Sequence, residues 1–454
     1  MNNTQPNRLQ INQIEYSNQL AQTLFAPIST QNWAMLLRSA SQQHVDSRFD
    51  ILVANPLVTL VTHGDDTHVC SGNDNYHSQQ DPFQLIEQEL ASQLGTLDYQ
   101  GELPFIGGAL GYFAYDLGRR VEALPSLAEH DLTSPDMAVG IYEWAVIVDH
   151  KQQQAWVVGQ NIEQHWQWLQ SQQATDEAPF ALTADWQSNM SKAQYEQKFA
   201  QVQEYLLSGD CYQINLAQRF SASYQGSEWQ AYCQLEQVNQ APFSAFVRTE
   251  HSAILSVSPE RFLQVNHGII ETKPIKGTRP RFSDPEQDLA SANELAAAEK
   301  DQAENLMIVD LLRNDVGRVA KPGTVHVPKL FDIESFPAVH HLVSTIKAEL
   351  DEKYHCLDLL RASFPGGSIT GAPKVRAMEI IEELEPHRRS AYCGSIGYIS
   401  RHGRMDTSIT IRTLVAENDK LHVWAGGGLV ADSQADSEYQ ETFDKLSRIL
   451  PVLS

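Results

Sequence analysis

Lys276 is the residue of this sequence with the clearest capacity for covalent chemistry. It lies in the basic stretch Lys273-Pro-Ile-Lys-Gly-Thr-Arg-Pro280, where Pro274 and Gly277 set the backbone on either side. We therefore expect a stiff turn that presents the amine. A lysine amine becomes a nucleophile when burial or a neighbouring cation removes its proton. Most single lysines are solvated surface residues, so the neighbouring motifs must decide.

Two pairs of acidic residues could hold a cation. Asp301 and Glu304 are spaced i,i+3 in an Ala-rich segment, and Glu438 and Glu441 have the same spacing. On a helix this spacing puts both carboxylates on one face, which is mildly destabilising without a cation. Because 57 of the 454 residues are acidic, such pairs also occur by chance. The spacing alone does not establish a metal site.

Glycine-rich segments could bind an anion. Phe364-Pro-Gly-Gly-Ser-Ile-Thr-Gly-Ala-Pro-Lys374 has the glycine spacing of a phosphate-binding loop, but Ala372 and Pro373 stand where Lys and Ser or Thr are required. We therefore reject a nucleotide site. Ala425-Gly-Gly-Gly428 could offer backbone N–H groups to a carboxylate, and Arg412 could bind one through two hydrogen bonds. The structural alternatives are a tight turn and a solvent-facing strand residue.

Several of these motifs resemble the chorismate-utilising enzymes. Pro274-Ile-Lys-Gly-Thr278 is similar to the Pro-Ile-x-Gly-Thr signature of that family, and the resemblance extends through further motifs from Trp33 to Lys445. The branch that forms anthranilate usually has Ala at the central position. With Lys276 at this position, the sequence resembles the branch that forms 4-amino-4-deoxychorismate, on the route to p-aminobenzoate and folate. The resemblance implies that ammonia replaces the 4-hydroxyl of chorismate through a covalent intermediate on Lys276.

The resemblance also implies roles for residues that are unremarkable alone. Glu260, otherwise an ordinary ion-paired acid, would be the general acid and base. His341, otherwise a packed histidine, would lie near the departing hydroxyl. The residues implied to contact chorismate are Gly277, Thr278, Thr370, Tyr392, Arg412, Gly426, Gly427, Gly428 and Lys445.

The acidic pairs resemble the segments of the family that bind Mg²⁺. Glu304 and Glu441 would be direct ligands, and Asp301 and Glu438 would hold water molecules of the ion. Hard oxygen ligands from two helices, with water retained, are what Mg²⁺ favours.

Gln213 and the cysteines bear on the nucleophile that enters. The water-adding members of the family carry Lys at the position of Gln213, whereas an amide cannot act as a base. Water addition is therefore not expected. None of the five cysteines lies in a Gly-x-Cys-x-Gly context typical of a glutaminase nucleophile. Ammonia must arrive free or from a partner glutamine amidotransferase subunit.

Two other functions on the same fold stay open. One is component I of anthranilate synthase, which Lys276 disfavours. The other is a non-catalytic tryptophan-binding regulator. The regulator is disfavoured by the presence of Lys276, Glu260, Glu304 and Glu441, because a protein without catalytic activity need not keep all four residues.

Three segments resemble those that enclose tryptophan in the family: Leu36–Ser39, Asp46–Phe49 and Pro242–Ser244. The structural alternative is a core seam between the two halves. The feedback-inhibited anthranilate branch carries Leu-Leu-Glu-Ser where Arg38 stands here, so we expect tryptophan to bind while barely inhibiting. The residues expected to line this pocket are Ser39, Asp46, Ser47, Arg48, Phe49, Pro242, Phe243 and Ser244.

The composition describes an ordinary globular protein, with 42% hydrophobic and 20% charged residues. A net charge of −24 argues against binding to nucleic acid or to an anionic membrane. The scattered cysteines suit a reducing cytoplasm. The N-terminus lacks the layout of a signal peptide, and no run approaches the ~20 apolar residues of a membrane helix. We expect a cytoplasmic protein.

The pattern of elements indicates an α+β protein, because strands and helices mix without regular βαβ spacing. We expect an N-terminal region over 14–150, a linker over 151–189 and a catalytic region over 190–450, the two regions interlaced in one globular unit. A capped helix should run from Ser191 to Gly209. The other expected elements are paired strands over 51–62, strands over 104–116, 137–148, 212–220, 392–400, 408–416 and 421–425, and helices over 288–314 and from Ser437. The resemblance implies an anthranilate-synthase-like fold: two large antiparallel sheets packed face to face, with helices outside.

Overall fold

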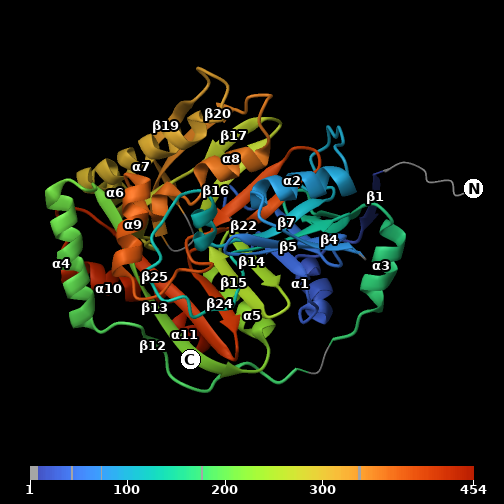
Figure 1. Cartoon of the computed structure of the whole chain (residues 1–454), viewed down its shortest axis with the longest axis horizontal. Helices are drawn as coiled ribbons and strands as arrows, with labels where there is room; N and C mark the ends of the chain where they lie inside the picture. The colour runs from blue at the N-terminus through green and yellow to red at the C-terminus, as the bar shows by residue number, and fades with distance from the viewer. Residues whose placement is uncertain (1–8, 42–43, 73, 175–176, 336–338) are drawn as a thin grey trace, which may run out of the picture.

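The computed structural model describes residues 9–41, 44–72, 74–174, 177–335 and 339–454. Its strands form two large antiparallel sheets that lie at the centre of the molecule, with helices around them (Figure 1). This arrangement confirms the expected α+β class and the two-sheet architecture. None of the described helices is long and apolar enough to cross a membrane.

The first sheet has thirteen described strands. Strands from before and after residues 151–189 share it. Its order is β1 (Gln10–Ile14), β10 (Gln154–Gly159), β9 (Trp144–Asp149), β3 (Phe49–Val53), β2 (Met35–Arg38), β14 (Phe243–Arg248), β15 (Ser252–Ser258), β24 (Thr413–Glu417), β25 (Lys420–Leu429), β13 (Gln213–Gln225) and β11 (Ala181–Leu182), with β12 (Gln187–Ser188) and β21 (Gly371–Ala372) also paired to β13.

The second sheet has twelve described strands. It too combines strands from both ends of the chain. Its order is β18 (Ile275–Pro280), β20 (Val339–Glu349), β17 (Ile269–Thr272), β16 (Arg261–Asn266), β23 (Met405–Ile409), β22 (Ser395–Ser400), β7 (Gly108–Phe113), β8 (Met137–Tyr142), β4 (Val58–His63), β5 (Asp66–Ser71) and β6 (Asp74–Ser78), with β19 (His326–Ser335) also paired to β20.

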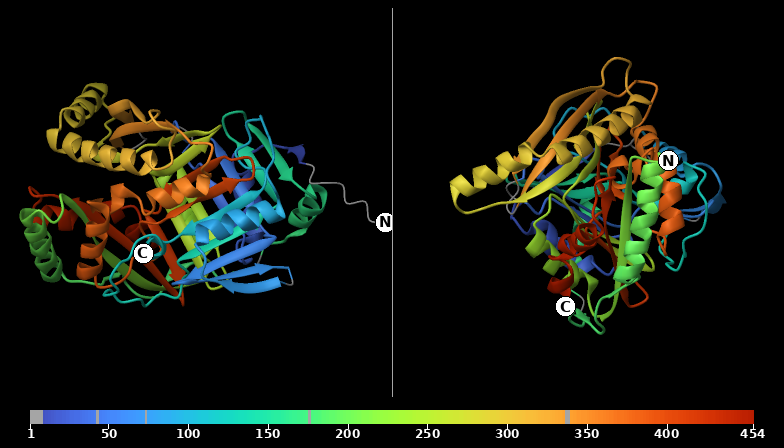
Figure 2. Two further views of the ribbon diagram at one scale, coloured as in Figure 1. Left: turned by 45° about the horizontal axis from the view of Figure 1, so that its top comes forward. Right: turned by 90° about the vertical axis from the view of Figure 1, so that its left-hand side faces the viewer.

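The helices lie outside the sheets, and α6 and α7 project from the two-sheet body (Figure 2). The α-helices are α1 (Leu20–Phe25), α2 (Pro82–Gln93), α3 (Ile162–Ser171), α4 (Lys192–Ser208), α5 (Glu228–Asn239), α6 (Pro285–Ala296), α7 (Glu299–Gly317), α8 (Cys356–Ser363), α9 (Lys374–Leu384), α10 (Ala435–Leu446) and α11 (Leu450–Leu453). Short 3₁₀ helices are η1 (Ala26–Ile28), η2 (Tyr115–Arg120) and η3 (Gly367–Ile369).

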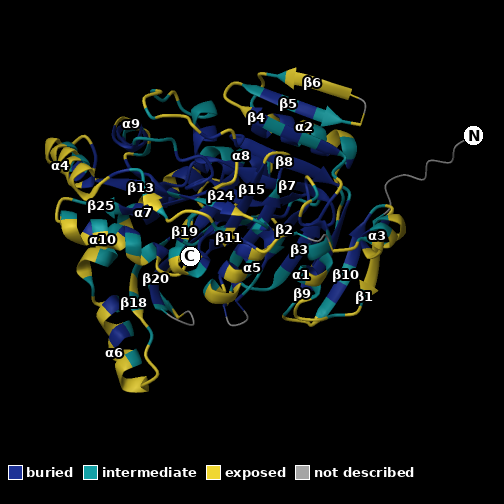
Figure 3. Ribbon diagram, turned by 90° about the horizontal axis from the view of Figure 1, so that it is seen from below, coloured by how far each residue is buried: buried dark blue, intermediate teal, exposed yellow. Residues whose placement is uncertain are grey.

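The main hydrophobic core lies between the sheets. It joins inward side chains of the first sheet, such as Ile51 and Val247, to those of the second, such as Leu60 and Leu263. A second core packs the opposite face of the first sheet against helices such as α5, through Tyr232 and others. Figure 3 shows the sheets as the buried centre and α6 as largely exposed. Burial of apolar surface on both faces explains why the sheet strands read as continuous hydrophobic runs.

Three expected strand runs pass from one sheet to the other. Residues 51–62 form β3 and β4, which lie in different sheets and do not pair with each other. Residues 137–148 form β8 and β9, and residues 408–416 include β23 and β24, again in different sheets. We expected residues 51–62 to form two paired strands, and residues 137–148 and 408–416 to form one strand each. These expectations were wrong. The cause is that both segments face one core, so the apolar pattern continues through the bend.

The helices agree more closely with expectation. Ser191 and Gln194 form the capping box of α4, and Gly209 ends the helix in the left-handed conformation. The Ala-rich run is two helices, because the chain breaks between α6 and α7 at Ala297 and Ala298. The segment 151–189 contains β10 and α3 as well as connecting chain.

Candidate active site

Lys276 lies on strand β18, not in the turn that we expected. The pairing of β18 with β20 shifts between Lys276 and Thr278, which marks a β-bulge. Gly277 has φ +68°, and a Cβ there would lie 2.7 Å from Leu295 and 2.8 Å from Asp301. Glycine is the residue that tolerates both this positive φ and the lack of room for a Cβ. The bulge brings Lys276 and the helices after it into one site.

Ser368 connects Lys276 to Glu260. The Lys276 amine donates to the Ser368 carbonyl oxygen at 3.4 Å, and the Ser368 hydroxyl donates to Glu260 at 2.9 Å. Ser368 lies on η3, within the glycine-rich segment. The sequence pattern drew attention to the glycines of that segment and missed this serine.

The two titratable groups have displaced pKa values. Burial raises the pKa of Glu260 to about 7, against the opposing effects of Ser368 and Lys276. Loss of hydration lowers the pKa of Lys276, although Glu304 and Glu260 favour its charged form. A carboxyl that can keep its proton near neutral pH and an amine that loses one more easily are suited to acid catalysis and nucleophilic attack.

His341 and Arg412 lie close enough to each other to interact electrostatically. The Nδ1 atom of His341 is 3.0 Å from the hydroxyl of Thr278. Burial and then the charge of Arg412 lower the pKa of His341 to about 4, so its ring is neutral near pH 7. Arg412 has φ +51° in the bend between β23 and β24, is half-buried, and makes no ion pair with any described residue. It is therefore available to an anion.

The glycines of β25 let polar side chains of neighbouring elements approach the strand closely. A Cβ at Gly428 would lie 2.2 Å from the Gln213 amide, and one at Gly427 would lie 3.0 Å from Glu438. The buried Oε1 atom of Gln213 has no hydrogen-bond partner among the described residues. Lys445 donates to the Gly426 carbonyl oxygen at 2.7 Å. This part of the site offers polar groups that a substrate can satisfy.

The four expected metal-binding carboxylates come from α7 and α10. Glu304 and Glu438 are shielded enough that burial raises the pKa of each. Lysines contact the two proposed ligands, Lys300 at 3.9 Å from Glu304 and Lys445 at 2.7 Å from Glu441. No three of these carboxylates bring oxygens within 4.8 Å of one another in the described structure. The described side chains are therefore too far apart for three of these carboxylates to bind one ion directly.

A different cluster has tighter spacing. His44, Asp46 and Glu334 bring ligand atoms within 4.8 Å of one another. Lys273 lies 3.3 Å from Asp46 and 2.7 Å from Glu334, and Arg261 lies 2.6 Å from Asp46. These cations already neutralise both carboxylates. The cluster is therefore an ion-pair network rather than a metal site.

Buried groups that the sequence did not single out support the substrate segment. Arg389 donates to the carbonyl oxygens of Ile369 at 3.0 Å and Asn215 at 2.6 Å, and pairs with Glu385 at 2.7 Å. It thereby ties η3 to β13, which carries Gln213. No local pattern announces a role that depends on contacts between distant elements.

Of the other expected substrate residues, Thr370 and Tyr392 are buried. The Thr370 hydroxyl donates to the Gly366 carbonyl oxygen at 3.1 Å, and the Tyr392 ring stacks on Trp424. Lys374 pairs with Asp315 of α7 at 2.6 Å. The Lys374–Asp315 ion pair ties the end of the glycine-rich segment to α7.

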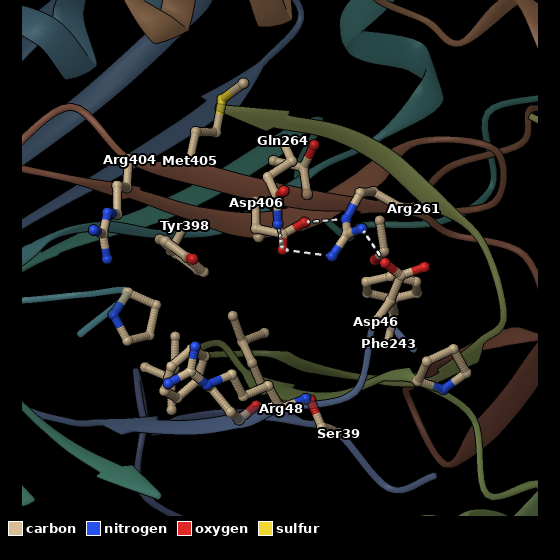
Figure 4. A pocket seen from close by; sticks show the side chains of 18 of the residues that line it. Ser39, Asp46, Arg48, Phe243, Arg261, Gln264, Tyr398, Arg404, Met405 and Asp406 are labelled. Atoms are coloured by element: carbon tan, nitrogen blue, oxygen red, sulfur yellow. Dashed lines mark hydrogen bonds and ion pairs between the residues drawn. The ribbon is translucent and has the colours of Figure 1, made fainter. Parts of the chain in front are cut away.

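A separate cavity of about 320 Å³ lies between the two sheets (Figure 4). Its walls are β2 and β14 on one side and β16, β22 and β23 on the other. It is lined by seven of the eight residues expected around tryptophan, namely Ser39, Asp46, Arg48, Phe49, Pro242, Phe243 and Ser244; Ser47 is not among them. The occupant stays a prediction from the sequence.

Charged groups organise this cavity. Arg261, next in sequence to Glu260, binds Asp406 at 3.0 Å and Asp46 at 2.6 Å, as Figure 4 shows, and its guanidinium lies over Phe243. The side chain of Arg38 is held by Asp50 and Glu236, each at 2.9 Å. Arg38 is therefore fixed by its own partners.

The family described as chorismate binding enzyme matches residues 34–451. The chain belongs to the chorismate-binding enzymes.

Individual relatives refine this membership. The aminodeoxychorismate synthase component 1 of Escherichia coli (strain K12) is 59% identical, over 95% of this chain and 96% of that protein. The anthranilate synthase component 1 of Lactococcus lactis subsp. lactis (strain IL1403) is 34% identical, over 92% and 94%. The solved structure of anthranilate synthase component I from Streptococcus pneumoniae TIGR4 has a TM-score of 0.80 and 31% identity, over 90% of this chain and 93% of that one.

Proposed function

We propose that this chain is a component 1 of aminodeoxychorismate synthase, which converts chorismate and ammonia to 4-amino-4-deoxychorismate. The observation that carries the proposal is the Lys276–Ser368–Glu260 connection in a chain of this family. The much higher identity to the aminodeoxychorismate synthase than to the anthranilate synthase supports the choice of branch.

Lys276 and Glu260 divide the chemistry. The neutral amine of Lys276 bonds to C2 of chorismate, the ring double bonds shift, and the C4–O bond breaks. Glu260 gives its proton to the hydroxyl, which leaves as water. Ammonia then bonds to C4, the double bonds shift back, and the amine of Lys276 leaves C2. The carboxylate of Glu260 takes a proton back from the new ammonium group at C4. The net change is the exchange of hydroxyl for amine with release of water.

The remaining residues bind and orient chorismate. Arg412, which has no ionic partner among the described residues, pairs with one carboxylate of this dianion. The backbone of Gly426–Gly428 and the amine of Lys445 hold the same end of the substrate. Neutral His341 and Thr278 lie by the departing hydroxyl. The guanidinium of Arg412 and the amine of Lys445 supply the local positive field that the overall charge of −24 does not.

Mg²⁺ is the proposed cofactor. Glu304 and Glu441 would bind it, with Asp301 and Glu438 holding its water molecules. When bound, the ion neutralises a substrate carboxylate and fixes its orientation.

The proposed partner is a separate glutamine amidotransferase subunit. Burial raises the pKa of four of the five cysteines, Cys211, Cys233, Cys356 and Cys393, which disfavours a thiolate nucleophile. The fifth, Cys70, lies on β5 in the second sheet, on the far side of β7 and β8 from β18. The chain therefore needs an external source of ammonia.

The mass of the product tests the function. Purified chain with chorismate, an ammonium salt and Mg²⁺ should yield 4-amino-4-deoxychorismate. Anthranilate would favour the other enzyme branch, and unchanged chorismate would favour a non-catalytic regulator.

A trapped intermediate tests the covalent step. Mass spectrometry of protein quenched with chorismate should find an adduct on the peptide that contains Lys276. Lys276→Ala should abolish the adduct, whereas Lys347→Ala, on the neighbouring strand β20, should keep it. An unchanged rate and product in Lys276→Ala would exclude the covalent route.

A further inference from the structure

Each proposed metal ligand has a lysine one helical turn away. On α7, Lys300 lies 3.9 Å from Glu304; on α10, Lys445 lies 2.7 Å from Glu441. Both helices lie at the left-hand end of the molecule in Figure 1. Each carboxylate therefore meets a cation in the absence of metal.

The two lysines differ in their other contacts. Lys445 also donates to the Gly426 carbonyl oxygen at 2.7 Å, so it is tied to the substrate-binding strand. Among the described residues, Glu304 is the one ion-pair partner of Lys300, whose side chain is 57% exposed. Lys300 can therefore move away without breaking another described polar contact.

The positive charge of Lys300 lies against the carboxylate of Glu304, 3.9 Å away on the same helix. It partly neutralises the ligand that α7 would offer to the metal.

We propose that Lys300 is a resident counter-cation of the metal site, which stabilises the metal-free enzyme and is displaced when the divalent ion binds. The proposal rests on the metal site of the proposed function. Two consequences follow. Lys300 weakens metal binding, because part of the carboxylate charge is already neutralised and must be released. It also limits how much the metal stabilises the fold, because the metal-free state is not left with unopposed charge.

Mn²⁺ binding measures the first consequence. Electron paramagnetic resonance of free Mn²⁺ should show tighter binding to Lys300→Met than to the wild type, by roughly two- to tenfold at low salt, with a smaller difference at high salt. Lys321→Met is the matched control, since Lys321 is similarly exposed and lies 3.3 Å from Glu349, its ion-pair partner. Neither residue belongs to the proposed metal site. Lys321→Met makes the same change in net charge and should leave the Mn²⁺ affinity unchanged.

Thermal stability measures the second consequence. Lys300→Met should have a lower Tm than the wild type in chelator and a larger rise in Tm on addition of Mn²⁺. Unchanged or weaker Mn²⁺ binding by Lys300→Met would overturn the role of Lys300 alone. A wild-type chain that binds no Mn²⁺ at all would overturn the metal site and this proposal with it, while leaving the amination assay to judge the function separately.

Discussion

Glu260 shows how burial sets the chemistry of a single residue. Its carboxyl group is buried and accepts a hydrogen bond from the Ser368 hydroxyl, and its pKa is raised to about 7. Between its ordinary pKa of 4.5 and about 7, the folded chain binds a proton that the unfolded chain does not. Stability should therefore fall as pH rises through this window, and the cost is fully present above it.

Glu260→Gln should separate stability from activity. The amide removes the cost of a buried carboxylate, so the variant should have a higher Tm than the wild type at pH 8 and lose this advantage near pH 4. It cannot donate a proton, so amination should fall at least ~100-fold. In the wild type, formation of the Lys276 adduct needs Glu260 protonated and Lys276 neutral, so its rate should pass through a maximum with pH, with one inflection near pH 7 set by Glu260. Calorimetry checks the stability and quenched-flow mass spectrometry the adduct rate; a wild-type profile without an inflection near pH 7 would contradict the acid role.

At the scale of elements, sequence reasoning succeeded where one element carries its own signal. The caps of α4 were predictable because Ser191, Gln194 and Gly209 act within a turn or two of one another. The strand crossings were not, because a bend such as the one at Arg412 leaves the apolar pattern intact. Ser368 and Arg389 were missed because their roles come from contacts across the fold.

The proposed metal site also belongs to this scale, because apolar contacts that do not involve it hold α7 and α10 in place. Ile308, Val309 and Leu312 hold α7 against β20, and Leu446 anchors α10. Glu304→Gln or Glu441→Gln should therefore fold normally by circular dichroism but lose at least ~10-fold in rate, or ~1.4 kcal/mol of barrier. Asp310→Asn, an exposed change of the same type on α7, should be silent. Full activity in excess chelator would remove the metal from the mechanism.

The whole molecule contains the proposed amination site, and the proposal assigns the supply of nitrogen to another protein. The purified chain should use ammonium salts and ignore glutamine, and a separate glutaminase subunit should confer glutamine-dependent activity. The amount of 4-amino-4-deoxychorismate formed with ammonium salts and with glutamine, in the presence and absence of the glutaminase subunit, checks this prediction. Glutamine use by the homogeneous chain alone would reveal a glutaminase site within it.

The inter-sheet cavity is the other feature of the whole molecule. Both sheets contribute walls to it, so an occupant stabilises their packing. Phe49 and Phe243 suit an indole ring, and Arg48 and the hydroxyl groups suit an amino-acid end. We expect tryptophan to bind and to raise the Tm. Phe243→Ala should lose this rise, whereas Phe282→Ala, an exposed phenylalanine outside the cavity, should keep it.

Binding should nevertheless inhibit amination very little. A ligand shifts an equilibrium only through different affinities for two states. Arg38, which stands where the inhibited anthranilate branch has an acid, is already held by Asp50 and Glu236, so it has little freedom to respond to the ligand. Titration calorimetry measures the binding of tryptophan, and amination rates at the same tryptophan concentrations measure the inhibition. No binding at millimolar tryptophan would eliminate the pocket, and strong inhibition would show that Arg38 does not uncouple the cavity from Glu260.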